Sequence, residues 1–366
     1  MNKIRHFVDI QELSRKEIFE IFTLMGFLKE ARYNGAVPKL LANKTLAMIF
    51  EEPSTRTRVS FEAAMTLLGG HAQYLKPGEI HLGVRESLYD TVKVLSHICD
   101  GIMCRALKHK TITNIVKYSD VPVLNGLSDY NHPTQAICDA FTMLEYIPKL
   151  KNKKYHEIDF STIKVVFIGD RTNVCSSTMQ IVTKLGMNFI HISPDKYKSP
   201  DEWIKMAQQN IKEAHSGSVK WTNDVDQIKG ADIVYTDLWW WVDQEDEATE
   251  RVKAFKPTYQ VSPRLMQKAG RDALFMHCLP ASRNVEVFDE VIDSKQSIVF
   301  EQAENRLTAQ MGLLVYYLYP RIDESSKAVK IYHRGRIESF MKSINRSWKE
   351  RYTYNNDSKN DNVQKK

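Results

Sequence analysis

The 366-residue sequence lacks any run of apolar residues long enough to cross a membrane, and its first residues contain no apolar core of a secretory signal. Its five cysteines are odd in number, and it lacks pairs of cysteines at the close spacing of a zinc site or a redox motif. Structural zinc sites and redox motifs need such pairs, so neither is predicted. These absences predict a cytoplasmic protein with no membrane partner, in which most cysteines are buried apolar side chains.

The main part of the chain also lacks an excess of positive charge. The whole sequence has a formal charge of +6, but residues 327–366 hold eleven Lys and Arg against four Asp and Glu. This surplus of seven leaves about −1 for the preceding 326 residues. Nucleic-acid binding depends on a basic surface, so no nucleic-acid partner is predicted.

Two domains are expected, because 366 residues exceed the length that one hydrophobic core usually organises. In both halves, apolar runs that suit buried strands alternate with helical patterns, which is typical of parallel sheets covered by helices. These runs lie at 46–50, 72–75, 101–104, 164–169, 188–192, 232–236 and 274–277. The predicted fold class is α/β, with two doubly wound parallel-sheet domains at 1–148 and 149–320. Such folds bind ligands at the carboxyl ends of their strands, so two facing sheets predict one cleft between them.

A loop at residues 169–173 follows the first strand-like run of the second half and invites comparison with a dinucleotide-binding loop. The repeated glycines that let a pyrophosphate approach the backbone are missing from it. No cofactor is therefore predicted.

The segment Ser54-Thr55-Arg56-Thr57-Arg58 stands where a strand-like run gives way to a helical pattern that ends at Gly69. A helix N-terminus offers unpaired N–H groups and a positive dipole end, and guanidinium groups add paired donors for oxyanions. The segment therefore predicts a phosphate site. Taken alone, it fits equally well a Ser or Thr helix cap beside two solvated arginines.

Three further segments accompany this one, namely 129–135 (Asp-Tyr-Asn-His-Pro-Thr-Gln), 277–280 (His-Cys-Leu-Pro) and 304–306 (Glu-Asn-Arg). In their order and separations, the four segments resemble aspartate and ornithine carbamoyltransferases over about residues 3–320. The resemblance implies that a carbamoyl group moves between carbamoyl phosphate and an amine in a cleft between the two domains. It also implies that the helix at 304–319 crosses back to the first domain.

The resemblance assigns carbamoyl phosphate to particular residues. Its phosphate would be held by Ser54, Thr55, Arg56 and Thr57. Arg105, His132 and Arg306 would donate to the carbonyl oxygen, where negative charge develops during the reaction. Gln135, one helical turn after His132, would accept from the carbamoyl NH₂ group. Taken alone, Arg105 also suits a surface residue at a strand end, and His132 before Pro133 suits a helix start.

The resemblance places Cys278 and Leu279 beside the amine, with backbone carbonyls that orient the carbamoyl group. A covalent acyl intermediate on Cys278 is not expected, although a cysteine near a histidine would otherwise suggest one, and an ordinary core thiol is the alternative. No metal is expected, since guanidinium groups supply the positive charge. In ornithine enzymes a glutamine in the loop after Leu75 reaches a neighbouring subunit's carbamoyl phosphate. His81 stands in its place, and we expect activity to depend on this loop.

The amine side departs from the ornithine enzymes. Those enzymes carry a Ser-Met-Gly string after the aspartate that corresponds to Asp237, and a second asparagine where this chain has Val174. These groups bind the α-amino and α-carboxylate groups of an amino acid. Here Leu-Trp-Trp-Trp-Val-Asp follows Asp237, and indoles suit an alkyl diamine better than a carboxylate. Core packing of the tryptophans is the alternative. The predicted amine-binding residues are Asn173, Asp237, Trp240, Trp241 and Asp243.

Within the family, the chain therefore most resembles members that use putrescine, forming N-carbamoylputrescine and phosphate or making carbamoyl phosphate in reverse. Ornithine as the amine substrate and a catalytically silent binding subunit are the alternatives. Residues 321–366 predict an amphipathic basic helix and a disordered polar tail. The resemblance implies that this helix contacts a neighbouring subunit of a homotrimer, the alternative being a helix that lies on its own subunit.

Overall fold

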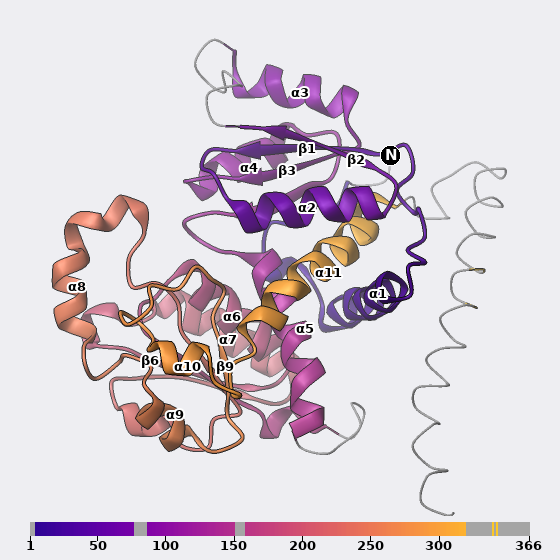
Figure 1. Cartoon of the computed structure of the whole chain (residues 1–366). Coiled ribbons are helices and arrows are strands. Elements are labelled where there is room, and N and C mark those ends of the chain that lie inside the picture. The colour runs from indigo at the N-terminus through magenta and orange to yellow at the C-terminus, as the bar shows by residue number, and fades with distance from the viewer. Residues whose placement is uncertain (1–3, 77–85, 151–157, 320–338, 340–341, 343–366) are drawn as a thin grey trace, which may run out of the picture.

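The computed structural model describes residues 4–76, 86–150 and 158–319, together with residues 339 and 342. These residues form a four-stranded and a five-stranded sheet, at the top and the bottom of Figure 1, and neighbouring strands within each sheet are parallel. The predicted α/β fold class with two parallel-sheet domains is confirmed. The expected C-terminal helix and tail at 321–366 lie outside the described residues, apart from positions 339 and 342. Among the described helices, none combines the length and the hydropathy that a membrane span requires.

The first sheet has the strand order β2-β1-β3-β4. Alternate residues of its central strand point to opposite faces, so Ala47 and Ile49 pack on one side and Met48 and Phe50 on the other. The strands are β1 (Thr45–Phe50), β2 (His71–Leu75), β3 (Gly101–Arg105) and β4 (Val123–Leu127). Helices cover both faces, with α3 and α4 on the Ala47 side. The helices are α1 (Arg15–Tyr33), α2 (Thr55–Leu67), α3 (Leu88–Ile98), α4 (His109–Tyr118) and α5 (Pro133–Leu150).

The second sheet has the strand order β7-β6-β5-β8-β9. Val165 and Phe167 of its central strand belong to the same hydrophobic core as residues around the first sheet. Val166 and Ile168 point to the other side, into a separate core. The strands are β5 (Lys164–Ile168), β6 (Asn188–Ile192), β7 (Ser218–Thr222), β8 (Ile233–Tyr235) and β9 (Leu274–Met276). The helices are α6 (Asn173–Lys184), α7 (Asp201–Ala214), α8 (Ala248–Phe255), α9 (Pro263–Ala269) and α10 (Asp289–Ile292). The short 3-10 helices are η1 (Ile10–Glu12), η3 (Phe160–Thr162), η4 (Asp195–Tyr197), η5 (Val225–Ile228) and η6 (Val242–Glu247).

Helix α11 (Val299–Leu318) follows the second sheet and packs against α1, α2 and α5 of the first half. It is buried on nearly all sides, and its buried residues include polar side chains such as Gln302 and Arg306 as well as apolar ones. At Gly312 the packing is closest, because an added Cβ would lie 2.5 Å from the Cγ atom of Met25 on α1. Only glycine fits there without a shift of the neighbouring side chain.

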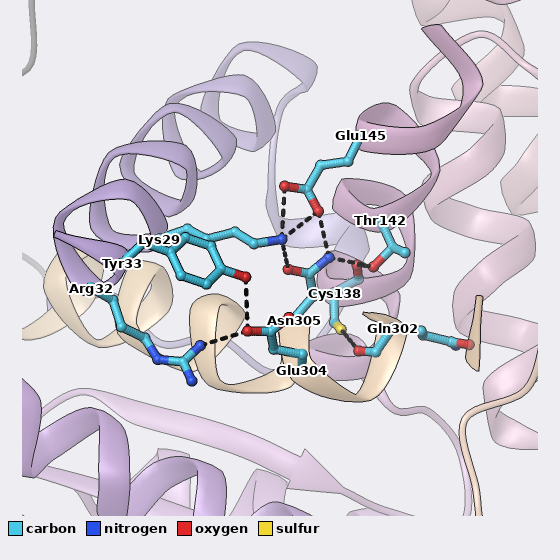
Figure 2. Close-up of polar contacts among 9 residues, drawn as sticks. All are labelled: Lys29, Arg32, Tyr33, Cys138, Thr142, Glu145, Gln302, Glu304 and Asn305. Carbon is cyan, nitrogen blue, oxygen red and sulfur yellow. Dashed lines mark hydrogen bonds and ion pairs between the residues drawn. The ribbon is translucent and has the colours of Figure 1, made fainter. Parts of the chain in front are cut away.

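Polar contacts fix α11 relative to α1 and α5 (Figure 2). The Nζ atom of Lys29 on α1 donates to Glu145 on α5 and to Asn305 on α11, each at 2.7 Å. The Nδ2 atom of Asn305 donates to Glu145 at 2.7 Å and to Thr142 at 3.0 Å. These hydrogen bonds hold α11 against α1 and α5.

Strands β4 and β7 were not predicted from the sequence, and each omission has a physical reason. In β4 the apolar run is broken by Asn125 and Gly126, yet Asn125 is buried because its Nδ2 atom donates to the carbonyl oxygen of Val8 at 2.9 Å. Strand β7 lies at the edge of its sheet and is partly exposed, so its sequence is polar. Tertiary contacts, and not local hydrophobicity, therefore make these two segments strands.

Candidate active site

The carboxyl ends of strands from both sheets border one cleft. Phe50 at the end of β1 lies beside Arg105 at the end of β3, so the segments that follow these strands begin at the same sheet edge. The cleft has a volume of about 220 Å³ and is lined from both halves of the chain. Its lining includes Arg105, Lys108 and Asp129 from the first half and Thr172, Asn173 and Trp241 from the second. This is the position at which open α/β sheets bind ligands.

The N-terminus of α2 is free to bind an anion. Ser54 is the N-cap residue, but its side chain makes no capping hydrogen bond. The first N–H group bonded within the helix is that of Arg58, which donates to the carbonyl oxygen of Ser54 at 3.0 Å. The N–H groups of Thr55, Arg56 and Thr57 therefore have no acceptor within the helix and can donate to a ligand. Arg58 does not share this arrangement, because it pairs with Glu62 at 3.0 Å on the exposed face.

Arg306 joins three residues that the sequence analysis assigned to carbamoyl phosphate. Its Nη2 atom donates to the Thr57 hydroxyl at 3.2 Å, and its Nη1 atom donates to Oε1 of Gln135. The same Nη1 atom lies 3.2 Å from Nε2 of His132. All four side chains are almost fully buried. The structure thus brings residues from α2, α5 and α11 together around one guanidinium group.

Three arginines form a concentrated positive charge at this point. Burial, and then the charge of Arg306, lowers the pKa of Arg105 to about 10, and burial also lowers the pKa of Arg56. The Nε atoms of Arg105 and Arg306 are buried and have no hydrogen-bond partner among the described residues. No described carboxylate lies within ion-pair distance of Arg56, Arg105 or Arg306. Desolvated cations without a counterion provide a strong site for an anion such as a phosphate.

His132 is a neutral imidazole in this environment. Burial and, after it, the charge of Arg306 lower the pKa of His132 well below its usual 6.5. Because Nε2 accepts from Arg306, the ring proton lies on Nδ1, which is 3.4 Å from the hydroxyl of Thr134. Donation from Nε2 to a carbonyl oxygen therefore requires Arg306 to leave its present contact and the ring to change tautomer.

Cys278 carries a protonated thiol. Its Sγ atom donates to Oδ1 of Asp237 at 3.2 Å, and burial followed by the charge of Asp237 raises the thiol pKa well above its usual value. A thiolate nucleophile needs the opposite shift. Leu279 adopts a φ of 58°, and its N–H group donates to Nδ1 of His277 at 2.9 Å. These contacts fix the backbone on both sides of the Cys278 carbonyl group.

Asp237, His277 and Cys278 offer three potential metal-ligand atoms within 4.8 Å of one another. Both ring nitrogens of His277 already face other groups, Nδ1 the Leu279 N–H group and Nε2 the carboxylate of Glu286 at 3.3 Å. The Cys278 thiol is protonated and bonded to Asp237. The three residues therefore fit a hydrogen-bonded cluster better than a metal site, which needs a deprotonated thiol and a free imidazole nitrogen.

The predicted amine-binding residues differ in their positions. Asn173 begins α6 and lines the cleft. Its Nδ2 atom donates to the Ser128 carbonyl oxygen at 2.6 Å, and its Oδ1 atom has no partner among the residues that the structure describes. Trp241 also lines the cleft, whereas Trp240 packs against the core of the second sheet. Asp237 is buried beside Cys278. The side chain of Asp243, in η6, and all of His81 lie outside the described part of the chain.

Two features of the site were not predicted from the sequence. A buried ion pair joins Arg251 to Asp170, which lines the cleft. Asp139, Tyr235 and Gln302 form a buried hydrogen-bonded group next to Gln135. The contact between Asp139 and Gln135 could have been predicted from the sequence, because Asp139 follows Gln135 by four residues and so lies on the same face of the helix.

Comparison with known proteins gives the family. Residues 5–145 match the description "Aspartate/ornithine carbamoyltransferase, carbamoyl-P binding domain", and residues 161–317 match "Aspartate/ornithine carbamoyltransferase, Asp/Orn binding domain". The chain belongs to the aspartate/ornithine carbamoyltransferase family. The first matched region of this carbamoyltransferase contains Arg56, Arg105 and His132, and the second contains Asn173 and Trp241.

Individual relatives agree with this assignment. The carbamoyltransferase is 79% identical over 357 residues to the putrescine carbamoyltransferase of Mycoplasma capricolum subsp. capricolum, with 98% of each chain covered. The identity and coverage are the same for the putrescine carbamoyltransferase of Mycoplasma mycoides subsp. mycoides SC. Among solved structures, ornithine carbamoyltransferase from Pyrococcus furiosus matches with a TM-score of 0.79 and 44% identity, covering 85% of this chain and 96% of that one.

Proposed function

We propose that this enzyme transfers a carbamoyl group between carbamoyl phosphate and putrescine, giving N-carbamoylputrescine and phosphate, and that it can also run in reverse. The observation that carries the proposal is the group of three desolvated guanidiniums, those of the partly buried Arg56 and Arg105 and of the buried Arg306, beside the free N-terminus of α2. It suits a dianionic phosphate and a carbonyl oxygen that becomes negative in the transition state. The likeness to two putrescine carbamoyltransferases supports putrescine as the amine.

The proposed mechanism assigns a task to each group. The N–H groups of α2 and Arg56 bind the phosphate, and Arg105 and Arg306 stabilise the developing oxyanion. The neutral amine attacks the carbonyl carbon, and the bond between that carbon and the phosphate oxygen then breaks. The departing phosphate takes the proton that the amine nitrogen loses. Because an amine with a pKa near 10 is mostly protonated at neutral pH, the site must select its neutral form.

The amine pocket favours a diamine over an amino acid. Val174 is buried, and Trp241 lines the cleft where the ornithine enzymes are expected to hold the α-amino and α-carboxylate groups. A carboxylate without donors would lose its hydration there, whereas an alkyl chain can pack against the indole. We propose that Asn173, Asp237, Trp240, Trp241 and Asp243 form this pocket.

An amine panel tests the proposed function. We expect purified protein with carbamoyl phosphate to form ureido product from putrescine at least about 100-fold more efficiently than from ornithine or lysine, because burying an unpaired carboxylate costs several kcal/mol. Cadaverine and agmatine complete the panel, with product measured colorimetrically. Faster formation of citrulline would favour ornithine as the substrate, and no product with any amine would favour a silent binding subunit.

A second prediction concerns Cys278. We expect Cys278→Ser to retain kcat within about 10-fold, because a hydroxyl can still donate to Asp237 and a single hydrogen bond contributes about 1 kcal/mol. Cys278→Ala removes the donor and serves as the matched comparison. Steady-state kinetics with putrescine would detect a loss of about 10⁶-fold in both variants if the thiol were a covalent nucleophile.

The remaining assignments are also proposals. We propose a homotrimer in which the helix within 321–366 contacts a neighbouring subunit and His81 reaches that subunit's carbamoyl phosphate. We also propose domain boundaries at 148/149 and at 320. A cytoplasmic location is supported by the five cysteines, all of which are free thiols, as is usual in a reducing compartment.

A further inference from the structure

One buried carboxylate connects the two halves of the candidate site. Asp139 on α5 is fully buried and accepts three hydrogen bonds, each of 2.7 Å. The donors are Nε2 of Gln135 on α5, Nε2 of Gln302 on α11 and the hydroxyl of Tyr235 on β8. No described cation forms an ion pair with this carboxylate. Its charge is balanced mainly by these three donors, which come from three separate elements.

The contacts of Asp139 determine how the Gln135 amide is oriented. An ionised carboxylate can only accept hydrogen bonds, so the amide nitrogen of Gln135 must face Asp139. At the other end of the amide, the guanidinium of Arg306 can only donate, so the Oε1 atom must face Arg306. The amide therefore has one orientation, with its oxygen toward the buried guanidinium cluster.

Through Gln302, Asp139 is also connected to the segment after β9. The Nε2 atom of Gln302 donates to Asp139, and its Oε1 atom accepts from the backbone N–H group of His277 at 3.0 Å. The orientation of this amide is fixed in the same way as that of Gln135. The thiol of Cys138, next to Asp139, donates to the Gln302 carbonyl oxygen at 3.2 Å and ties the two helices together (Figure 2).

We propose that Asp139 is a positioning residue, which holds the Gln135 amide with Oε1 turned toward the carbamoyl group of the substrate. This proposal rests on the proposed carbamoyl transfer. Asp139 itself does not touch the substrate. Its effect passes through Gln135, whose oxygen accepts from the carbamoyl NH₂ group, and through Gln302 to the backbone of His277.

The protonation state of Asp139 is consistent with this task. Burial raises the pKa of Asp139 to about 6, against the opposing effect of its three hydrogen bonds and of Arg306. Above that pH the carboxylate is ionised and accepts from all three donors. An amide at this position would instead present an N–H₂ group to one of those donors and leave it unpaired, or turn the Gln135 amide around.

Ligand binding without an amine substrate separates this proposal from the proposed function. Phosphonoacetamide, a stable analogue of carbamoyl phosphate, contains the NH₂ group that Gln135 would accept from, whereas inorganic phosphate does not. We expect Asp139→Asn to weaken phosphonoacetamide binding by about 10-fold and to leave phosphate binding unchanged, measured by calorimetry. Equal weakening of both ligands, or of neither, would overturn the proposal.

A double-mutant cycle tests whether Asp139 acts through Gln135. We expect Asp139→Asn to lower kcat/KM by about 100-fold, as a misplaced site group does. In the Gln135→Leu variant, adding Asp139→Asn should lower kcat/KM only slightly further. Additive losses would contradict the proposal. If the wild-type enzyme transfers no carbamoyl group to any amine, the proposed function fails, and the binding experiment still decides the role of Asp139.

Two further variants control for folding. Thr142 lies one turn after Asp139, is also buried, and accepts from Asn305 of α11, so Thr142→Val removes an α5–α11 contact away from Gln135. We expect this variant to keep its kcat/KM, and a loss equal to that of Asp139→Asn would show that helix packing alone matters.

If Asp139→Asn does not fold, the charge-swapped pair Gln135→Glu with Asp139→Asn is used. The pair restores a donor facing an acceptor and should be at least about 10-fold more active than Gln135→Glu alone; no restoration would refute the idea.

Discussion

Replacing Arg306 by methionine should lower kcat/KM for carbamoyl transfer by about 100- to 1,000-fold. The guanidinium touches Thr57, His132 and Gln135, so its loss removes a donor for the developing oxyanion and also leaves three buried polar groups without their shared partner. Methionine keeps most of the volume, so the change is mainly one of charge and hydrogen bonding. Single-turnover kinetics would separate the loss in the chemical step from a loss in carbamoyl phosphate binding.

Arg58→Met is the matched control for this prediction. Arg58 belongs to the same motif as Arg56, but it pairs with Glu62 and lies over the ring of Tyr74 on the exposed side of α2. We expect a change in kcat/KM of less than about 3-fold, since such a pair contributes little. If both variants lost activity equally, the distinction between a buried guanidinium cluster and a solvated arginine would be wrong.

The largest expected effect on stability comes from Arg251→Met. This side chain is 7% exposed and forms an ion pair with Asp170, which is 9% exposed, and it also donates to the Trp239 carbonyl oxygen at 2.8 Å. Removing one partner leaves the other charge buried without compensation, so we expect the free energy of unfolding to fall by about 3–5 kcal/mol. Urea denaturation followed by circular dichroism would measure the loss.

Arg283→Met serves as the comparison within the same domain. Arg283 also pairs with two acidic residues, Asp289 and Asp293, but the three side chains are 42%, 44% and 58% exposed. Water replaces these interactions when the arginine is removed, so we expect no measurable loss of stability. A loss as large as that of Arg251→Met would mean that burial does not decide the effect.

Much of the candidate site was predictable from local sequence. Ser54 to Arg58 form a contiguous pattern in which a helix start and two arginines follow a strand end, and a helix start has the same chemistry in any fold. The strand that ends at Arg105 and the strand that ends two residues before Asp237 were predicted because their apolar runs are uninterrupted. Strand β4 was not predicted, because Asn125 and Gly126 break its run. It joins the sheet by pairing with β3, and the Val8 carbonyl oxygen accepts from the buried Asn125 amide.

The tryptophans illustrate the limit of local patterns. Three consecutive indoles give no indication of which one faces a ligand. In the folded chain, Trp239 is fully buried and stacks on Phe255 at 5.0 Å, Trp240 packs against the core, and Trp241 lines the cleft. Their roles differ because the loop after β8 is irregular. Side chains of an irregular loop do not alternate with a fixed period, so the sequence does not predict where each one points.

By itself, the sequence determined the fold class, the family and the segments that are proposed to bind the phosphate, because each depends on residues that are neighbours along the chain or repeat with a fixed period. Only the tertiary structure decided which side chains act as a unit. Asp139 meets Tyr235 across 96 residues and Gln302 across 163, and Arg306 meets Thr57 across 249. Such pairs form only when strand ends from two sheets and the returning helix α11 are packed together, and their hydrogen bonds gain their strength from the burial that this packing creates.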